Sequence, residues 1–322
     1  SAELFAELLQ EKMPDEIREL SLYYYGEALA KSEQNAEAIK QFEELVKTYP
    51  KSEMAAFAKL SLGRLYAVPG AHANLARSKQ LLNELSETPP TPRLGAEALF
   101  LVARAEFSAK NFKEAADAFR RLESTYPQDV RVAESRLQAA WAYSNAGFYD
   151  NAIKSCDAAL NVANTSLPRS ERVEYLYIRA CCAFQLLRYD EAVKGYRETV
   201  AADPQSPFAA KSQYQVALSA YRLAHYDEAM SALNPILSDK SLRQDALWLM
   251  AEAAAGKNDS DQSVQYYKML VSEYPDSPYT PDALYRLGHQ LQLRKAWGDA
   301  SVFFLQLVER FPGSPLAPRA LF

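Results

Sequence analysis

The sequence predicts an all-α protein built as a solenoid of helical hairpins. Three observations lead to this fold class: two sets of small residues recur at a nearly fixed period, apolar residues follow spacings of three and four, and glycine is scarce at 10 of 322 residues. Such spacings place apolar side chains on one face of a helix, and a fixed period is typical of repeat architectures. So few glycines argue against a meander of tight β-hairpins.

The second helix of each hairpin is marked by a small residue, a large residue four positions later and a proline eight positions after that. The first copy has Ala38, Phe42 and Pro50, and proline is missing only from the fourth and sixth copies. Because proline lacks an N–H and disfavours α geometry in the residue before it, we expect it to end the helix. The later small residues, in steps of 34 to 40, are Ser78, Ala115, Ala152, Ala192, Ala229, Ser263 and Ala300. Their large partners are Leu82, Phe119, Cys156, Tyr196, Leu233, Tyr267 and Phe304.

The first helix carries its own small residue, twelve positions before the small residue of the second helix. It is Gly26 in the first copy, and in the second copy Gly63 is displaced by a three-residue insertion at Pro69–Gly70. We expect the two small residues to face each other and to let the helices approach closely, so that a larger side chain would cost about 1–3 kcal/mol. The remaining copies have Ala103, Ala140, Ala180, Ala217, Ala251 and Gly288.

Short polar turns such as KNFK, GFYD, LRYD and AHYD join the two helices of a hairpin. One hairpin cannot bury its apolar face alone, so stacked neighbours must provide the core. We therefore expect one continuous array over residues 1–322. The longer connection NVANTSLPRSE at residues 161–171 predicts a possible bend or sub-domain boundary near residues 164–172.

These residues resemble the tetratricopeptide repeat family, which implies a right-handed α-α superhelix with about eight full repeats. A half-repeat is expected at each end, because Phe5–Pro14 echoes Phe42–Pro50 and residues 311–322 echo residues 274–285. We expect the chain to be a slice of a longer protein. Most steps exceed the family's period of 34, and the extra residues form joints such as YPKSEMA. This joint resembles the repeats of bacterial envelope proteins of the BamD and YbgF kinds and of exopolysaccharide secretion scaffolds.

Nothing in the sequence predicts catalysis, a cofactor or a metal site. The three histidines, His72, His225 and His289, lie in different repeats and at different places within them, so no ligand set has workable spacing. No HExxH, GxSxG, P-loop or GxGxxG motif occurs. The cysteines Cys156, Cys181 and Cys182 are odd in number, and we expect them to be small buried residues. The sequence therefore favours a non-enzymatic protein.

Composition limits the classes of partner. The formal net charge is −5, so a general affinity for nucleic acid has no electrostatic basis. No apolar run approaches the ~20 residues that a membrane-spanning helix needs. A protein or peptide partner remains as the expectation.

An aromatic column predicts where that partner binds. Three residues before the small residue of the first helix, six of eight copies have an aromatic side chain. The resemblance implies that first helices line the concave groove of the superhelix, and Tyr, Trp and Arg are residue types that anchor interfaces. With neighbours on the same helix face, the predicted groove residues are Phe100, Arg104, Phe107, Trp141, Tyr177, Tyr214, Tyr221, Trp248 and Tyr285. The alternative is that the column packs between hairpins as core.

The predicted function is a protein–protein interaction scaffold that binds a peptide or protein in its groove, in a bacterial envelope assembly or secretion system. Its predicted location is therefore periplasmic or envelope-associated. Facing residues that are mainly aromatic, Glu and Leu argue against a clamp for a C-terminal carboxylate. Three alternatives stay open: a cytoplasmic chaperone or regulator, the substrate-recruiting arm of a larger enzyme, and a glycan-binding scaffold, which predicts an exposed aromatic rim.

Overall fold

A computed structural model describes residues 2–68, 70–162 and 167–321. These residues form eighteen α-helices and one short 3-10 helix and contain no strand, which confirms the predicted fold class. The chain divides into two compact units, unit 1 over Ser1–Ser155 and unit 2 over Cys156–Phe322. The predicted bend near residues 164–172 overlaps residues 163–166, which lie outside the described residues, and it stays a prediction.

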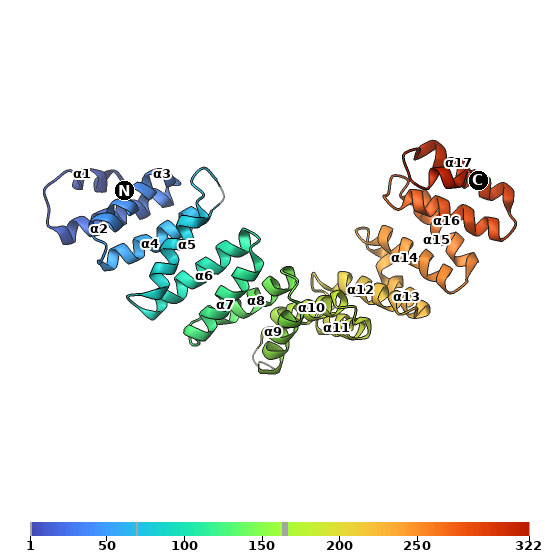
Figure 1. The fold of residues 1–322 in the computed structure, drawn as a ribbon, viewed down its shortest axis with the longest axis horizontal. Helices are drawn as coiled ribbons and strands as arrows, with labels where there is room; N and C mark the ends of the chain where they lie inside the picture. The colour runs from blue at the N-terminus through green and yellow to red at the C-terminus, as the bar shows by residue number, and fades with distance from the viewer. Residues whose placement is uncertain (1, 69, 163–166, 322) are drawn as a thin grey trace. The chain divides into compact units, whose positions relative to one another are not determined.

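The helices follow one another in chain order (Figure 1). Unit 1 holds α1 (Ala2–Leu8), α2 (Asp15–Lys31), α3 (Asn35–Thr48), α4 (Glu53–Ala67), α5 (Leu75–Glu87), α6 (Pro92–Ser108), α7 (Phe112–Thr125) and α8 (Val132–Asn145). The boundary between the units falls within α9 (Tyr149–Val162). Unit 2 continues with α10 (Arg169–Gln185), α11 (Tyr189–Ala202), α12 (Ala209–Arg222), α13 (Tyr226–Leu233), the 3-10 helix η1 (Asn234–Ser238), α14 (Arg243–Gly256), α15 (Ser260–Glu273), α16 (Thr280–Leu293), α17 (Trp297–Arg310) and α18 (Ala317–Ala320).

The eight hairpins are the predicted ones. Even-numbered helices from α2 to α16 are the first helices, and each is followed by its second helix, from α3 to α17. The single helices α1 and α18 pack on α2 and α17 as the two half-repeats. First helices of neighbouring hairpins also touch, α2 with α4 and α4 with α6 in unit 1, and α12 with α14 in unit 2. Below, the first-helix face of a unit means the side that these helices form.

The small residues of the second helices are all buried, as the repeat pattern predicts. In the second hairpin the small residues face each other as expected, because the Ser78 hydroxyl donates a hydrogen bond to the Gly63 carbonyl at 2.7 Å. The glycines have a further role. A Cβ atom on Gly26 would lie 2.6 Å from the ring of Phe42, so the missing side chain also makes room for the large partner. Sequence spacing had indicated only the contact between small residues.

The turn inside seven of the eight hairpins contains one residue in the left-handed helical conformation, seven positions after the small residue of the first helix. The residue that follows it donates its N–H to the carbonyl five positions earlier in the chain, as from Arg188 to Ala183 at 2.9 Å. This is a Schellman motif, which satisfies carbonyl groups at the end of a helix. The left-handed residues are Glu33, Lys110, Gly147, Leu187, Ala224, Asn258 and Lys295.

Prolines end the second helices where they were expected. The helices α3, α7, α15 and α17 stop two residues before Pro50, Pro127, Pro275 and Pro312. The sixth copy lacks this proline but has Pro235 earlier, and there α13 is only 8 residues long and continues as η1. A proline inside the helix removes one backbone hydrogen bond and clashes with the preceding turn, which explains the early end.

Candidate functional site

The aromatic column packs inside its own hairpins and also against the next hairpin, because the ring centroids of Tyr177 and Phe208 lie 4.7 Å apart and those of Trp248 and Tyr279 lie 5.3 Å apart. Phe100 contacts the large partner Phe119 with 5.9 Å between ring centroids, and Trp248 contacts Tyr267 at 5.8 Å. The same contact joins Tyr177 to Tyr196 at 6.0 Å and Tyr285 to Phe304 at 5.9 Å. Phe100 is buried, and the other three predicted rings, Tyr177, Trp248 and Tyr285, are half-buried. These rings therefore have a structural contact whether or not they also meet a partner.

Two further predicted residues pack across the turn of their hairpin. Phe107 meets Phe112 edge to face with 5.2 Å between centroids, and Tyr221 meets Tyr226 at 5.8 Å. Both are half-buried. Aromatic pairs at these separations stabilise a fold beyond the area they bury. These two ring pairs hold the first and second helix of their hairpins together next to the turn.

Trp141 and Tyr214 are half-buried on α8 and α12. Burial, followed by the charge of Asp245, raises the pKa of the Tyr214 hydroxyl well above its usual range. None of the eight predicted aromatic side chains is fully exposed. The exposed aromatic rim that the glycan-binding alternative requires is therefore not formed by these residues.

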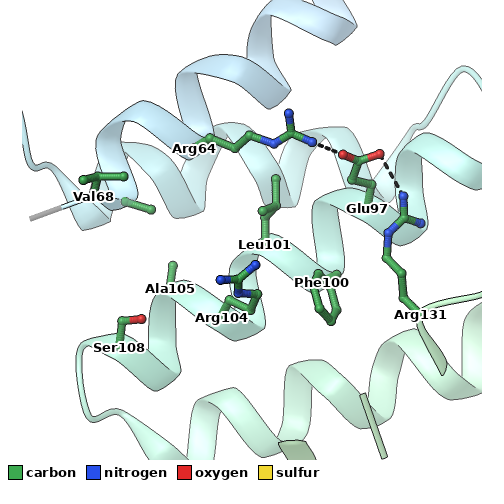
Figure 2. A pocket seen from close by; sticks show the side chains of 10 residues that line it. Arg64, Val68, Glu97, Phe100, Leu101, Arg104, Ala105, Ser108 and Arg131 are labelled. Carbon is green, nitrogen blue, oxygen red and sulfur yellow. Dashed lines mark hydrogen bonds and ion pairs between the residues drawn. The ribbon is translucent and has the colours of Figure 1, made fainter. Parts of the chain in front are cut away.

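Unit 1 has an open pocket of about 500 Å³ on its first-helix face. Two of the predicted residues, Phe100 and Arg104, line it from α6. Arg64 and Val68 reach it from the end of α4, and Arg131 from the start of α8 (Figure 2). The full lining is Arg64, Ala67, Val68, Glu97, Phe100, Leu101, Arg104, Ala105, Ser108 and Arg131.

A carboxylate fixes two of the three arginines of this pocket. Glu97 pairs with Arg64 through one oxygen and with Arg131 through the other, at 2.8 Å (Figure 2). Arg131 is held a second time, because its Nη1 donates to both carboxylate oxygens of Asp129 at 2.9 Å. Arg104 is bound differently, since its guanidinium lies over the ring of Phe100 at 5.8 Å from the centroid. An arginine in this position makes a cation–π contact.

Sequence reasoning found Arg104 but missed Arg64, Glu97 and Arg131. It therefore described the face as mainly aromatic, Glu and Leu, whereas in unit 1 three arginines gather around one pocket. A sign was present: Arg64 and Arg104 directly follow the small residues Gly63 and Ala103 of consecutive first helices. Equivalent positions in neighbouring repeats lie on the same face, so two arginines in this register predict a cationic patch.

The first-helix face of unit 2 holds a more closed network. Trp248 stacks on Tyr279 with 5.3 Å between centroids and 9° between planes, and Arg286 lies 5.5 Å from the centroid of the same ring. Glu252 pairs with Arg286 at 3.1 Å and accepts hydrogen bonds from the hydroxyls of Tyr267 and Tyr221. Burial is the first cause that raises the pKa of both hydroxyls, and the charge of Glu252 is the second. The polar groups of this cluster already satisfy one another.

The described residues contain no group of three or more His, Cys, Asp or Glu placed to hold a metal ion. Among the helices of the described ranges, none has the length and apolar character that a membrane crossing requires. None of the three cysteines, which all lie in the described ranges, forms a disulfide; Cys156 and Cys182 are buried and Cys181 is half-buried. Burial raises the pKa of the Cys156 thiol, which makes it less reactive.

Comparison with solved structures supports the fold. The apo form of RapI aligns with a TM-score of 0.58 and 15% identity over 94% of this chain and 95% of its own. A STAND protein with a tetratricopeptide repeat sensor, PH0952 from Pyrococcus horikoshii, aligns with a TM-score of 0.57 and 15% identity over 99% of this chain and 54% of its own. YrrB, described as a TPR protein with an unusual peptide-binding site, aligns with a TM-score of 0.50 and 16% identity over 64% of this chain and 98% of its own. At these identities the likeness concerns the fold alone.

Sequence comparison identifies the family. No curated protein sequence matches the chain. Two family models, both described as tetratricopeptide repeat, do match it, one at residues 20–52 and 245–277 and the other at residues 70–130 and 137–207. These segments are spread over both units and together cover more than half of the sequence, and the chain belongs to the tetratricopeptide repeat family.

Proposed function

We propose that this protein is a non-enzymatic interaction scaffold that binds an extended segment of a partner protein on the first-helix face of unit 1. The observation that carries the proposal is the open pocket of about 500 Å³ in which apolar side chains and arginines from three successive first-helix repeats meet. Concave sites with an apolar lining and a few placed polar groups are typical binding sites. The stacked hairpins hold these side chains at fixed positions, because each repeat packs on its neighbours.

The fold relationship agrees with this function. YrrB, which shares the fold, is described as having a peptide-binding site. The aromatic contacts within the hairpins also favour a preformed surface, because rings such as Phe100 are already fixed by packing against Phe119. A surface that is ordered before binding loses less conformational entropy when the partner arrives.

Site-specific photo-crosslinking tests this function. A crosslinking amino acid at Leu101, which lines the pocket, should attach to a partner, whereas the same group at Arg121 should not. Arg121 is exposed on the second helix α7 of the same hairpin, so the pair differs in face and not in repeat. Equal crosslinking at both positions, or crosslinking only at Arg121, would place the partner on another face.

We further propose that the scaffold works in a bacterial cell-envelope assembly. The support is the Tyr-Pro-x-Ser joint between repeats, as in residues 49–52 and 274–277. Fractionation of the cells that produce the protein tests this setting, with the crosslinked complex followed by mass. Recovery of the complex only from the cytosol would favour the chaperone or regulator alternative instead.

A further inference from the structure

The unit 1 pocket has a charge opposite to that of the chain. Its ten lining residues include three arginines and one glutamate, whereas the whole chain has a formal net charge of −5. A local positive potential within an acidic protein attracts and orients an acidic partner, and it repels a basic one. The charge of the pocket therefore carries information about the partner that the net charge does not.

Arg104 is the arginine that is free to meet a ligand. Arg64 and Arg131 are paired with Glu97, and Arg131 also with Asp129. Arg104 makes no ion pair with any carboxylate among the described residues, and its side chain is exposed to solvent. Its contact with Phe100 leaves the N–H donors of the guanidinium available, and these donors fit a carboxylate in a planar, two-bond geometry.

Apolar surface lies next to Arg104. Figure 2 shows Val68 and Ala105 on one side of the pocket, the Glu97 ion pairs on the other, and Leu101 and Arg104 between them. Val68 is 61% exposed, which leaves its aliphatic side chain available for contact with a ligand. A ligand that fills the pocket thus meets an apolar surface and a cation a short distance apart.

We propose that this pocket binds a peptide segment in which an Asp or Glu side chain neighbours an apolar residue. The carboxylate pairs with Arg104, and the apolar residue packs on Val68 and Leu101. The proposal rests on the proposed function and adds the chemistry of the partner to it. It places Arg104 in direct contact with the ligand and gives Glu97 a positioning role, since Glu97 holds Arg64 and Arg131 at the edge of the pocket.

The geometry favours an acidic side chain over a C-terminal carboxylate. A clamp for a chain end needs several donors that converge on one point. Here Arg64 and Arg131 converge on Glu97, which already occupies that point. The remaining donor, Arg104, offers one guanidinium on an open surface, which suits a carboxylate that projects from a continuing peptide.

Fluorescence anisotropy with the full chain tests the proposal. The probes are fluorescein-labelled synthetic peptides with blocked ends, one of alternating Asp and Leu and one with Asn in place of Asp. We expect the Asp peptide to bind at least about ten-fold more tightly than the Asn peptide, because a hydrogen bond to a charged group is stronger than one to a neutral group. We also expect this preference to shrink as salt is added.

Two variants of Arg104 and one control variant assign the preference to this residue. Arg104→Gln should lower the affinity for the Asp peptide about ten-fold and leave the Asn peptide unchanged. The control Arg121→Gln removes the same charge from the second-helix face and should change neither affinity. Arg104→Glu should reverse the preference towards a Lys-Leu peptide. Because Arg104 is exposed, each variant should keep the helical circular-dichroism signal and melting temperature of the parent protein.

Different outcomes separate this inference from the proposed function. If the Asp and Asn peptides bind equally and Leu101→Asp abolishes both, the face binds peptides but the acidic preference is wrong. If an Asn peptide with a free C-terminus matches the Asp peptide, the pocket recognises a chain end, which also overturns the inference. If no peptide binds and Leu101 gives no crosslink, the proposed function fails as well.

Discussion

Six residues with a Cβ atom adopt the left-handed conformation inside the hairpin turns, where glycine is the residue with the lowest cost. Only the fourth hairpin uses glycine, Gly147 with φ 80°. The six others have φ between 59° and 66°, close to the ideal left-handed helix. The turn geometry is therefore imposed by the packing of the two helices and not by the local sequence. This explains why turns as different as LRYD and AHYD form the same structure.

We predict that Leu187→Gly stabilises the protein. The left-handed conformation costs a residue with a Cβ about 1–2 kcal/mol, and Leu187 is 69% exposed, so little packing is lost. We expect a gain of about 1 kcal/mol, measured as a higher melting temperature in calorimetry. The reverse change at the same place in the neighbouring hairpin, Gly147→Ala, should lower the melting temperature. A loss of stability in Leu187→Gly would mean that the Leu187 side chain makes contacts in solution.

Glu106 is a buried carboxylate, only 2% exposed, and it is paired with Lys79 from the neighbouring hairpin. Its other partner is the side-chain amide of Asn111, at 2.8 Å. We predict that Lys79→Met destabilises the protein by about 1–3 kcal/mol, because the buried charge then loses its cation. Chemical denaturation measures this change, and Lys79→Met combined with Glu106→Gln should recover part of it.

The control for this prediction is an ion pair of the same kind at the surface. Lys40 lies 3.9 Å from Glu37, and the two side chains are 71% and 53% exposed. Lys40→Met should change the free energy of unfolding by less than about 0.5 kcal/mol, because water screens exposed pairs. Equal effects of the two substitutions would show that Glu106 is hydrated in solution.

The aromatic column shows how far single residues can be interpreted from sequence. The spacing correctly placed Phe100, Tyr177, Trp248 and Tyr285 at one position of the first helix. It could not tell a groove residue from a core residue, because a ring at this position packs on the second helix of its hairpin while Tyr177, Trp248 and Tyr285 also keep part of their surface exposed. The pairing of Glu97 with two arginines depends on side chains from three repeats, and such contacts are not visible in a one-dimensional pattern.

At the scale of helices, single glycines determine how closely the two helices of a hairpin approach each other. In the fifth hairpin, a Cβ atom on Gly195 of α11 would lie 2.9 Å from the Cβ of Ala180 on α10 and 3.3 Å from its Cα. Both contacts are with the backbone or the first side-chain atom of Ala180, so neither can move without a shift of the helix. Sequence spacing predicted the small residue Ala180 but assigned its contact to Ala192 alone.

We predict that Gly195→Ala destabilises the protein by about 1–3 kcal/mol through overpacking. The prediction opposes helix propensity, by which alanine in place of glycine would stabilise a helix by about 1 kcal/mol. Gly298→Ala is the matched control, because its Cβ would meet nothing within 4 Å. This control should keep or raise the melting temperature. If Gly195→Ala were also stabilising, α10 and α11 would lie further apart in solution than in the structure.

The ends of helices can be predicted from the sequence where a nearby residue such as proline determines them. Pro50, Pro127, Pro275 and Pro312 end their helices by geometry alone, so spacing was sufficient. The sequence did not predict the 3-10 helix η1. The repeat pattern has its proline after the second helix, whereas Pro235 lies within η1 itself. The left-handed turns were missed for another reason, since six of their seven residues are not glycine.

Within each unit, rings from both helices of a hairpin share one interior. Tyr175, Tyr196 and Tyr267 are among the largest fully buried side chains. The hydroxyl of Tyr196 donates to the sulfur of Cys181 at 3.3 Å, and that of Tyr267 donates to Glu252. Burial is the first cause that raises the pKa of Tyr196 and Tyr267. These hydroxyls have to stay protonated for the repeats to remain stacked. The whole molecule should therefore lose stability at alkaline pH.

We predict that the protein unfolds cooperatively as the pH rises from about 10 to 12. Burial and hydrogen bonds to carboxylates raise the pKa of Tyr66 and of Tyr279 to about 12 in the fold, whereas unfolded tyrosine titrates near pH 10. A tyrosine whose pKa is higher in the folded than in the unfolded state stabilises the fold fully below pH about 10. This stabilisation is lost as the pH rises towards the pKa of the folded state. Tyrosinate absorbance and far-ultraviolet circular dichroism, recorded together, should therefore show that the last part of the absorbance rise coincides with the loss of the helices. If the absorbance rise were complete near pH 10 while the helices persisted, the buried tyrosines would be open to solvent and the stacked core would be wrong.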